Sequence, residues 1–224
     1  REPIKMGLIF LGIAVGTIIG WLAAKRVQMT KMPELVSMFN GMGGACAAMI
    51  GLMEFHHNVG NTGPQMAVIL GMVIGSISFS GSVIAYLKLN GTMQKPIRIP
   101  SYNILNSIIL VGVLVYSGYM IFSGTSSSFL LYLLFAAALF YGIMFVIPIG
   151  GADMPVVISL LNSFTGLAAA FGGFLYDNKV MLTGGILVGS AGTLLTIVMC
   201  KAMNRSLWNV IFGAFGESAA GAGS

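Results

Sequence analysis

Seven long apolar segments, separated by short polar ones, run along the 224 residues of this chain. Each segment holds roughly 18 to 24 residues, and an α-helix of that length, rising about 1.5 Å per residue, spans about 30 Å of hydrocarbon. A membrane-crossing strand would alternate polar and apolar side chains, and the segments do not alternate. The pattern therefore predicts transmembrane helices at approximately 6–24, 35–53, 65–87, 102–122, 129–147, 154–176 and 180–202.

The composition narrows the class of protein further. Hydrophobic residues make up 57% of the chain and charged residues 8%, whereas a soluble domain contains about 25% charged residues. A water-soluble fold is therefore excluded. We expect an all-α integral membrane protein, a polytopic bundle of about seven transmembrane helices. Residues 1–203 would form the membrane domain and residues 204–224 a linker, and we expect both ends of the sequence to lie inside a longer protein.

The basic residues of the connecting segments predict the orientation of the bundle, because short cytoplasmic loops carry an excess of Lys and Arg. Three basic residues fall on one side, at Arg1, Lys5 and Lys179. The other eight share the opposite side, at Lys25, Arg26, Lys31, Lys88, Lys95, Arg98, Lys201 and Arg205. The C-terminus is thus predicted on the cytoplasmic or mitochondrial matrix side. The net charge of +5 follows from this topology and does not indicate nucleic-acid binding.

Glycine occurs 31 times and recurs at four-residue spacing inside several segments. Seams of small residues let membrane helices approach one another closely. We therefore expect small-residue packing seams and a tight bundle. The spaced glycines are Gly12, Gly16 and Gly20, then Gly71 and Gly75, then Gly185 and Gly189.

The second and sixth segments match at a constant offset of 122 residues. Both begin on the same side of the membrane, so the match indicates a parallel repeat. A weaker match pairs 80–82 with 191–193. The shared residues Met32, Pro33, Ser37, Asn40, Gly44, Ala47, Ala48 and Gly51 recur as Met154, Pro155, Ser159, Asn162, Gly166, Ala169, Ala170 and Gly173.

Two asparagines and two serines are the candidate polar residues of this repeat. Ser37 and Asn40 share one helix face, as do Ser159 and Asn162. Asn162 follows Asp153 by nine residues, about 13 Å at helical rise, which predicts a place near the bilayer midplane. Two interpretations remain open. The faces are either packing seams whose asparagines hydrogen-bond across helices or the lining of a hydrated path.

Ionisable residues all fall near the predicted membrane surfaces, and asparagine does not titrate. If protons cross this bundle, the titrating group must come from another subunit or segment. His56 and His57, beside Glu54, fit either an ordinary solvated loop or a mouth that gathers protons. Asp153 fits either a helix N-cap before Pro155 or a functional position at the cytoplasmic surface.

Chemical motifs of a complete enzyme are missing from the sequence. It pairs no nucleophile with a base, clusters no metal ligands and places no phosphate-binding loop after a strand. We therefore expect no catalytic residue, metal site, nucleotide-binding site or hydride-transfer site in this chain. Alone, the chain is not a complete enzyme.

Several motifs resemble the β subunit of proton-translocating NAD(P) transhydrogenase over essentially the whole chain. The specific ones are Ile149-Gly150-Gly151-Ala152-Asp153-Met154-Pro155-Val156-Val157, continuing through Leu161-Asn162-Ser163, and Cys200-Lys201-Ala202-Met203-Asn204-Arg205-Ser206. Supporting ones are Met32-Pro33-Glu34-Leu35-Val36, Phe79-Ser80-Gly81-Ser82 and Gly189-Ser190-Ala191-Gly192.

The resemblance implies a membrane domain that couples inward proton movement to hydride transfer between NADH and NADP. The cofactors NAD(H) and NADP would bind to associated soluble domains and not to this chain. The implied partners are the α subunit with its NAD domain and an NADP-binding domain reached through residues 204–224. The implied assembly is a homodimer in a bacterial or mitochondrial inner membrane.

The resemblance also implies roles for individual residues. Asn162 matches the family's functional asparagine on the proton path, and Asp153 matches its cytoplasmic aspartate. Arg205 lies in the hinge toward the NADP domain, with Lys201 and Asn204 beside it in the cytoplasmic coupling region. Asn40 stands where many members carry a proton-handling histidine. That departure implies additional membrane helices that supply a titrating histidine.

Two other functions remain open from the sequence. A self-contained transporter of a small solute would use the two repeats to bind its substrate. A purely structural membrane anchor subunit would not depend on either asparagine.

Overall fold

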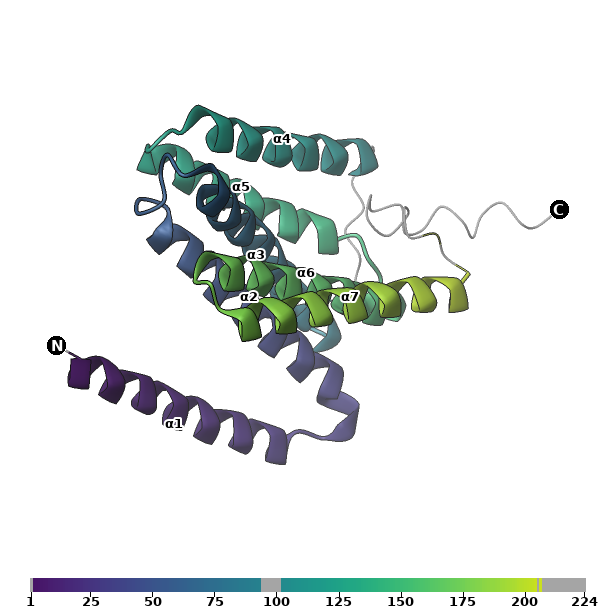
Figure 1. The fold of residues 1–224 in the computed structure, drawn as a ribbon. Coiled ribbons are helices and arrows are strands. Elements are labelled where there is room, and N and C mark those ends of the chain that lie inside the picture. The colour runs from purple at the N-terminus through teal and green to yellow at the C-terminus, as the bar shows by residue number, and fades with distance from the viewer. Residues whose placement is uncertain (1, 94–101, 205, 207–224) are drawn as a thin grey trace.

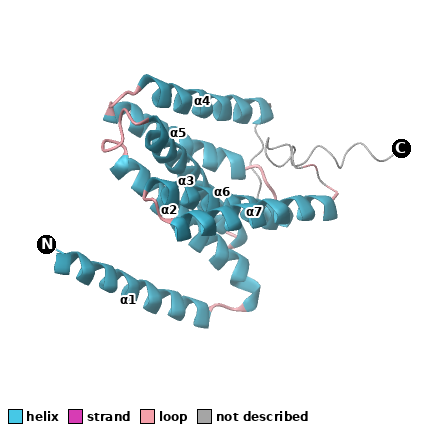
Figure 2. Cartoon of the chain, in the orientation of Figure 1, coloured by secondary structure: helices cyan, strands magenta, loops and turns pink. Residues whose placement is uncertain are grey.

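The computed structural model describes residues 2–93, 102–204 and 206. Within these residues the chain forms long helices joined by short loops, with no strand (Figures 1 and 2). Two 3₁₀ turns, Met29–Lys31 and Gly151–Asp153, precede α2 and α6. The helices are α1 (Glu2–Arg26), α2 (Met32–Glu54), α3 (Thr62–Leu89), α4 (Tyr102–Ser123), α5 (Ser128–Val146), α6 (Met154–Leu175) and α7 (Lys179–Ala202).

The described chain therefore contains seven helices that are long and apolar enough to cross a membrane. This confirms the predicted all-α membrane fold. No helix end lies more than four residues from its predicted position. The largest difference is at the start of α1, which begins at Glu2.

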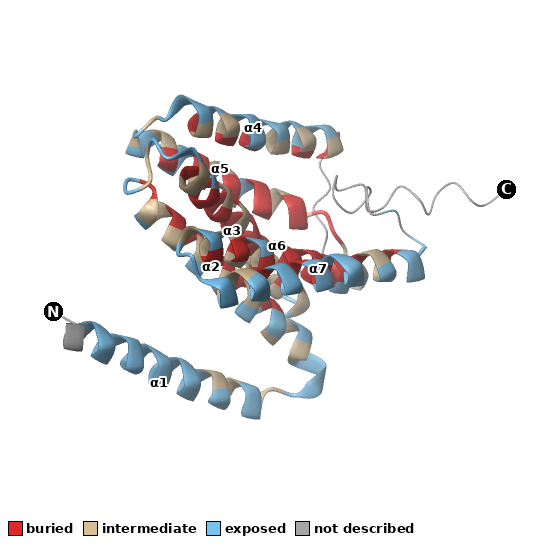
Figure 3. Cartoon of the chain, in the orientation of Figure 1, coloured by how far each residue is buried: buried red, intermediate tan, exposed pale blue. Residues whose placement is uncertain are grey.

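Helix α3 lies at the centre of the bundle. It packs against α2, α4, α5 and α6, and α7 covers α6 from the other side. Figure 3 accordingly shows the buried residues concentrated on α3, α5 and α6, while α7 and α4 present broad exposed faces. Exposed leucine, isoleucine and phenylalanine side chains on these faces are the surface that a bilayer covers.

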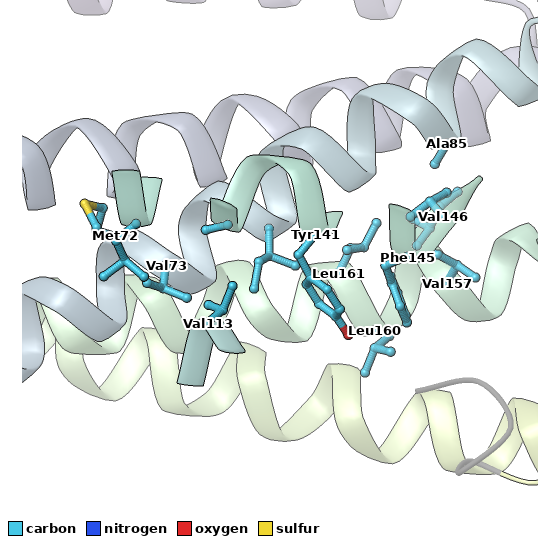
Figure 4. Packing of buried hydrophobic residues seen from close by; sticks show 14 of the residues in the cluster. Met72, Val73, Ala85, Val113, Tyr141, Phe145, Val146, Val157, Leu160 and Leu161 are labelled. Carbon is cyan, nitrogen blue, oxygen red and sulfur yellow. The ribbon is translucent and has the colours of Figure 1, made fainter. Parts of the chain in front are cut away.

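Large apolar side chains fill the space where α3, α5 and α6 meet (Figure 4). Leu161 of α6 and Val146 of α5 are fully buried, and Phe145 is 2% exposed. At Gly81 of α3 an added Cβ would lie 3.0 Å from Leu161 and 3.2 Å from Val146. The absence of a side chain at this position therefore lets the three helices share one core.

Glycine seams join α2 to α3 and α6 to α7 in the same way. A Cβ on Gly44 would lie 2.7 Å from the carbonyl oxygen of Gly75, and one on Gly75 would lie 2.8 Å from that of Gly44. In the second pair, a Cβ on Gly166 would lie 2.6 Å from the amide nitrogen of Gly189, and one on Gly185 would lie 2.7 Å from the Gly166 oxygen. Gly44 and its repeat counterpart Gly166 thus each allow close backbone contact with the neighbouring helix, α3 in one pair and α7 in the other.

Helix α1 departs from the expectation of a tight bundle. None of the residues from Lys5 to Arg26 is buried, and Figure 1 shows α1 standing apart from the other helices. Added Cβ atoms at Gly12, Gly16 and Gly20 would meet nothing within 4 Å. The predicted packing seam of α1 is therefore wrong for contacts within the described chain, because four-residue spacing of glycine permits close approach but supplies no partner helix.

Candidate functional site

A cluster of polar side chains lies between α2, α3 and α6. The side-chain amide of Asn40 on α2 donates hydrogen bonds to the hydroxyl oxygens of Ser82, at 2.9 Å, and Ser78, at 3.3 Å. Ser78 and Ser82 are four residues apart on α3, so they share one helix face opposite Asn40. The hydrogen bonds across helices that one of the two interpretations of Asn40 expects are therefore present.

The same cluster continues into α6 through Ser78. Its hydroxyl donates to the carbonyl oxygen of Leu161 at 2.9 Å and lies 2.6 Å from the hydroxyl of Thr165. Thr165 in turn donates to the Leu161 carbonyl at 3.2 Å. Each hydroxyl has a single proton. Ser78 can give its proton either to the Leu161 carbonyl or to Thr165, and Thr165 either to the same carbonyl or to Ser78. We call Asn40, Ser78, Ser82 and Thr165 the polar network.

The sequence indicated Ser82 through a weak repeat and a supporting family motif, and it did not single out Ser78 or Thr165. The available signal was the helical spacing of Ser78 and Ser82 within an otherwise apolar segment, because polar residues four apart line one face. The neighbouring Ser76 and Ser80 point elsewhere and donate to carbonyl oxygens of their own helix, at Met72 and Ser76. Because both serine pairs are four residues apart, spacing alone could not show which pair contacts α2.

Ser37 and Ser159, the matched serines of the repeat, make matched contacts. Ser37 on α2 donates to the carbonyl oxygen of Ser82 on α3 at 2.8 Å, and Ser159 on α6 donates to that of Gly192 on α7 at 3.1 Å. Ser163 extends the second seam by donating to the Gly189 carbonyl at 2.7 Å. Both predicted serines therefore belong to packing seams between paired helices, which was one of the two interpretations of these faces.

Asn162 lies elsewhere than its counterpart Asn40. Asn40 is half-buried, whereas Asn162 is exposed on the surface of α6. Its neighbours Leu161 and Ser163 are buried on either side, against α3 and α7. Within the described chain, no hydrogen bond joins the two amides. The face of α6 that carries Asn162 lies between α2 and α7. On the α2 side, Thr165 of α6 lies so close that a Cβ added to Gly43 would be 3.0 Å from its methyl carbon.

The chemistry of the polar network is that of amides and hydroxyls. These groups donate and accept hydrogen bonds and can hold water, but they neither gain nor lose a proton near neutral pH. In hydrocarbon surroundings their mutual hydrogen bonds are worth about 0.6 kcal/mol each. The network can thus conduct or order water, whereas a titrating step requires a group from outside it.

One end of the bundle gathers basic residues, at Lys25, Arg26, Lys31, Lys88 and Lys201, and we call it the basic end. Asp153 lies here, half-buried, at the N-cap position of α6 with Pro155 in the first turn. The N-cap position predicted for Asp153 is confirmed, although its side chain makes no capping hydrogen bond.

The other predicted coupling residues lie near the end of α7. Lys201 is exposed in the last helical turn, and Asn204 is exposed with a positive φ of 51° just after the helix. In the part of the chain that the structure describes, Asp153 makes no ion pair with Lys201. Arg205 and most of the predicted linker, 207–224, lie outside the described residues.

Lys88 was assigned by sequence to the loop after the third segment, and that assignment is wrong. Lys88 belongs to the last turn of α3 and is only 9% exposed. Its ammonium group donates hydrogen bonds to three carbonyl oxygens where α5 ends, those of Val146, Ile147 and Ile149. The apolar stem of a lysine can follow a helix surface inward while its charge finds acceptors, which a loop assignment does not anticipate.

The opposite end of the bundle carries a second group of polar residues. Tyr176, just after α6, donates a hydrogen bond to the Glu54 carboxylate at 3.1 Å, and His57 lies 3.7 Å from the same carboxylate. His56 pairs with the hydroxyl of Ser128 at 3.0 Å. Partial burial raises the pKa of Tyr176, and the adjacent negative charge of Glu54 raises it further. Both histidines are exposed, as expected for a solvated loop.

Comparison with known proteins adds to this geometry. The family model described as "NAD(P) transhydrogenase beta subunit" matches residues 1–224. A curated relative, NAD(P) transhydrogenase subunit beta of Rhodospirillum rubrum, is 41% identical over 219 residues, covering 93% of this chain and 47% of the relative. The sequence of that subunit from a named strain of the same organism gives the same values.

The chain thus spans about half the length of the curated relatives it matches. The match nevertheless extends over every helix described above, including the polar network and the basic end. By the match of the family model to its whole length, this chain belongs to the NAD(P) transhydrogenase beta subunit family.

Proposed function

We propose that this chain is the membrane domain of a proton-translocating NAD(P) transhydrogenase. It would couple inward proton movement to hydride transfer between NADH and NADP, which are bound by soluble domains outside this chain. The observation that carries the proposal is the family match over residues 1–224 of a chain whose described residues form seven helices long and apolar enough to cross a membrane. Residues 1–203 are the membrane domain, and 204–224 lead toward the NADP-binding domain.

The proton path in this proposal runs along the polar network and Asn162. Asn40, Ser78, Ser82 and Thr165 offer a connected series of donors and acceptors between three helices. They would hold the water through which a proton moves, because none of them titrates near neutral pH. Ser37 and Ser159 border this path from the adjoining packing seams.

The exposed position of Asn162 supports a further membrane helix against α6. A carboxamide facing hydrocarbon without a partner costs about 1 to 3 kcal/mol by protein mutational data. Such polar side chains in membrane helices face protein or water far more often than lipid. A helix from elsewhere in the assembly, packed between α2 and α7, would give Asn162 its partner and bring a titrating histidine to the middle of the membrane.

The coupling region in this proposal is the basic end. Asp153, Lys201, Asn204 and Arg205 would transmit the protonation state of the path to the NADP-binding domain, favouring either nucleotide exchange or hydride transfer. The excess of basic residues at this end supports a cytoplasmic position, or a matrix position in a mitochondrion. Such an arrangement puts the C-terminus on the same side as the NADP-binding domain and the NAD domain of the α subunit, within a homodimer.

The test uses the complete assembly and this chain separately, each sealed into vesicles with a pH-sensitive dye inside. Hydride transfer in the complete assembly should move protons across the vesicle membrane, and an ionophore should abolish the resulting pH difference. This chain alone should move neither protons nor solute. Hydride transfer without proton movement would reduce the chain to an anchor, and solute uptake by the chain alone would make it a transporter.

A further inference from the structure

Lys88 makes an unusual set of contacts for a lysine at the end of a membrane helix. Its Nζ atom lies 3.0 Å from the carbonyl oxygen of Val146 and 2.7 Å from that of Ile149, and it also donates to Ile147. An ammonium group has three N–H donors and no acceptor, so three carbonyl oxygens satisfy it completely. Taking such a charge out of water is costly unless every donor is used in this way.

These carbonyl groups lie at and just beyond the end of α5 at Val146, and of the three only that of Val146 accepts a backbone hydrogen bond within the turn, from the Ile149 N–H at 3.2 Å. The last four carbonyl groups of an α-helix have no intrahelical partner, and Pro148 has no N–H to offer them. The negative end of the helix dipole also lies there and favours a cation. Val146 and Ile149 are fully buried, so water is a poor substitute for Lys88.

Four of the other helix ends in the described chain solve the same problem locally. A residue with positive φ follows α3, α4, α6 and α7, at Gly91, Gly124, Asp177 and Asn204. Such left-handed residues turn the chain so that its own N–H groups cap the last carbonyls. Between Ile147 and Gly150 no residue has a positive φ. Apart from the bond from the Ile149 N–H to the Val146 carbonyl, the end of α5 therefore takes its donors from a different helix.

The borrowed cap connects two parts of the candidate site. Lys88 belongs to α3, which also carries Ser78 and Ser82 of the polar network. The carbonyl groups it binds belong to the turn that leads directly into Gly151–Asp153 and the start of α6. Lys88 is thus a side-chain tie between the helix of the polar network and the turn that places Asp153.

We propose that Lys88 is a positioning residue that holds the turn between α5 and α6 against α3, so that a change in the polar network moves Asp153. The inference rests on the proposed function, because it assigns Lys88 to the coupling of proton movement to hydride transfer. Lys88 touches neither substrate nor proton; it acts through the turn that it holds.

The test compares three substitutions in the complete assembly. K88M keeps much of the apolar stem but removes all donors, K88Q keeps neutral donors, and K88R keeps both charge and donors. K31M is the matched control, because Lys31 is an exposed lysine at the same end. Each variant is assayed in vesicles for protons moved per hydride transferred, and amide hydrogen exchange is measured at Ile149 and Asp153, whose N–H groups bond within this turn.

K88M should lower the ratio of protons to hydride by about tenfold and speed exchange of both amides by at least as much, a change about the size of one of the three charge-assisted hydrogen bonds that it removes. K88R should restore most of the ratio, K88Q should fall between, and K31M should match the wild type. A purely structural residue would lower the amount of assembly without changing the ratio in what remains.

The proposal is overturned if K88M keeps the wild-type ratio, or if K88R is as poorly coupled as K88M. If K88M fails to assemble, K88Q and K88R test the proposal instead. A wild-type ratio of protons to hydride in both variants would contradict the role of Lys88 in holding the turn. A wild-type assembly that transfers hydride without moving protons contradicts the proposed function instead. The exchange of the Ile149 and Asp153 amides then still decides whether Lys88 holds the turn.

Discussion

The amide nitrogen of Asn40 on α2 lies 2.9 Å from the hydroxyl oxygen of Ser82 on α3. This contact joins a residue of the repeated helix to the central helix of the bundle. The backbone carbonyl of Ser82 also accepts a hydrogen bond from Ser37, one turn away from Asn40. Position 82 therefore fixes α2 through two separate bonds, one to its side chain and one to its backbone.

A double-mutant cycle measures the first of these bonds. N40A and S82A, singly and together, should give a coupling of about 0.6 kcal/mol in the free energy of unfolding in detergent, the average for hydrogen bonds between membrane helices. The control pair is N40A with S117A, because Ser117 bonds only to Val113 of its own helix. The effects of that control pair on the free energy of unfolding should be additive. A coupling of zero between Asn40 and Ser82 would show that their hydrogen bond is not formed.

The glycine seam between α2 and α3 should not accept a methyl group. G44A places a Cβ 2.7 Å from the Gly75 carbonyl oxygen, so the helices must separate, at a cost of about 1 to 3 kcal/mol. G166A should cost a similar amount in the matching seam. The control is G112A on α4, where an added Cβ meets nothing within 4 Å. Thermal unfolding measured for the three variants decides, and equal midpoints for G44A and G112A would contradict the seam.

Tyr176 should make stability depend on pH in the alkaline range. Its pKa is raised in the folded protein, first by burial and then by Glu54, so the neutral phenol is the form that folding favours. This contribution is present below the unfolded pKa of about 10 and is lost as pH rises through the folded value. The melting temperature of the wild type should therefore exceed that of Y176F at pH 8, and the difference should shrink above about pH 10.

E54Q is the matched variant for this titration. Removing the negative charge leaves burial as a cause of the raised pKa, so the alkaline loss of stability should be smaller than in the wild type and should end at lower pH. A difference between wild type and Y176F that stays constant from neutral to alkaline pH would show that the contact of Tyr176 with Glu54 is not formed.

The helices were predictable because their signal is local. An apolar run of sufficient length must form its own hydrogen bonds in hydrocarbon, and a helix does so within one segment. The repeat was equally readable, since Gly44 and Gly166 occupy the same place in two helix pairs. Small residues at these positions are required by close backbone approach, wherever the pairs lie in the bundle.

The parts that escaped prediction depend on which helices become neighbours. Asn40 and Asn162 match in sequence, yet one contacts α3 and the other is exposed, because the two repeats occupy different places around the centre of the bundle. Lys88 looked like a loop residue because its partners lie 58 or more positions further along the chain. The glycines of α1 have the spacing of a seam without a partner in the described chain.

The central claim is that this bundle forms part of a proton path, and Asn162 tests it most directly. N162L replaces the amide by an apolar side chain of similar size, and N103L makes the same change on α4 as a control. The measurement is proton movement per hydride transferred by the complete assembly in sealed vesicles. N162L should lower this ratio by about tenfold, equivalent to one lost hydrogen bond of about 1.4 kcal/mol, while N103L should leave it unchanged. A wild-type ratio in N162L would contradict the account.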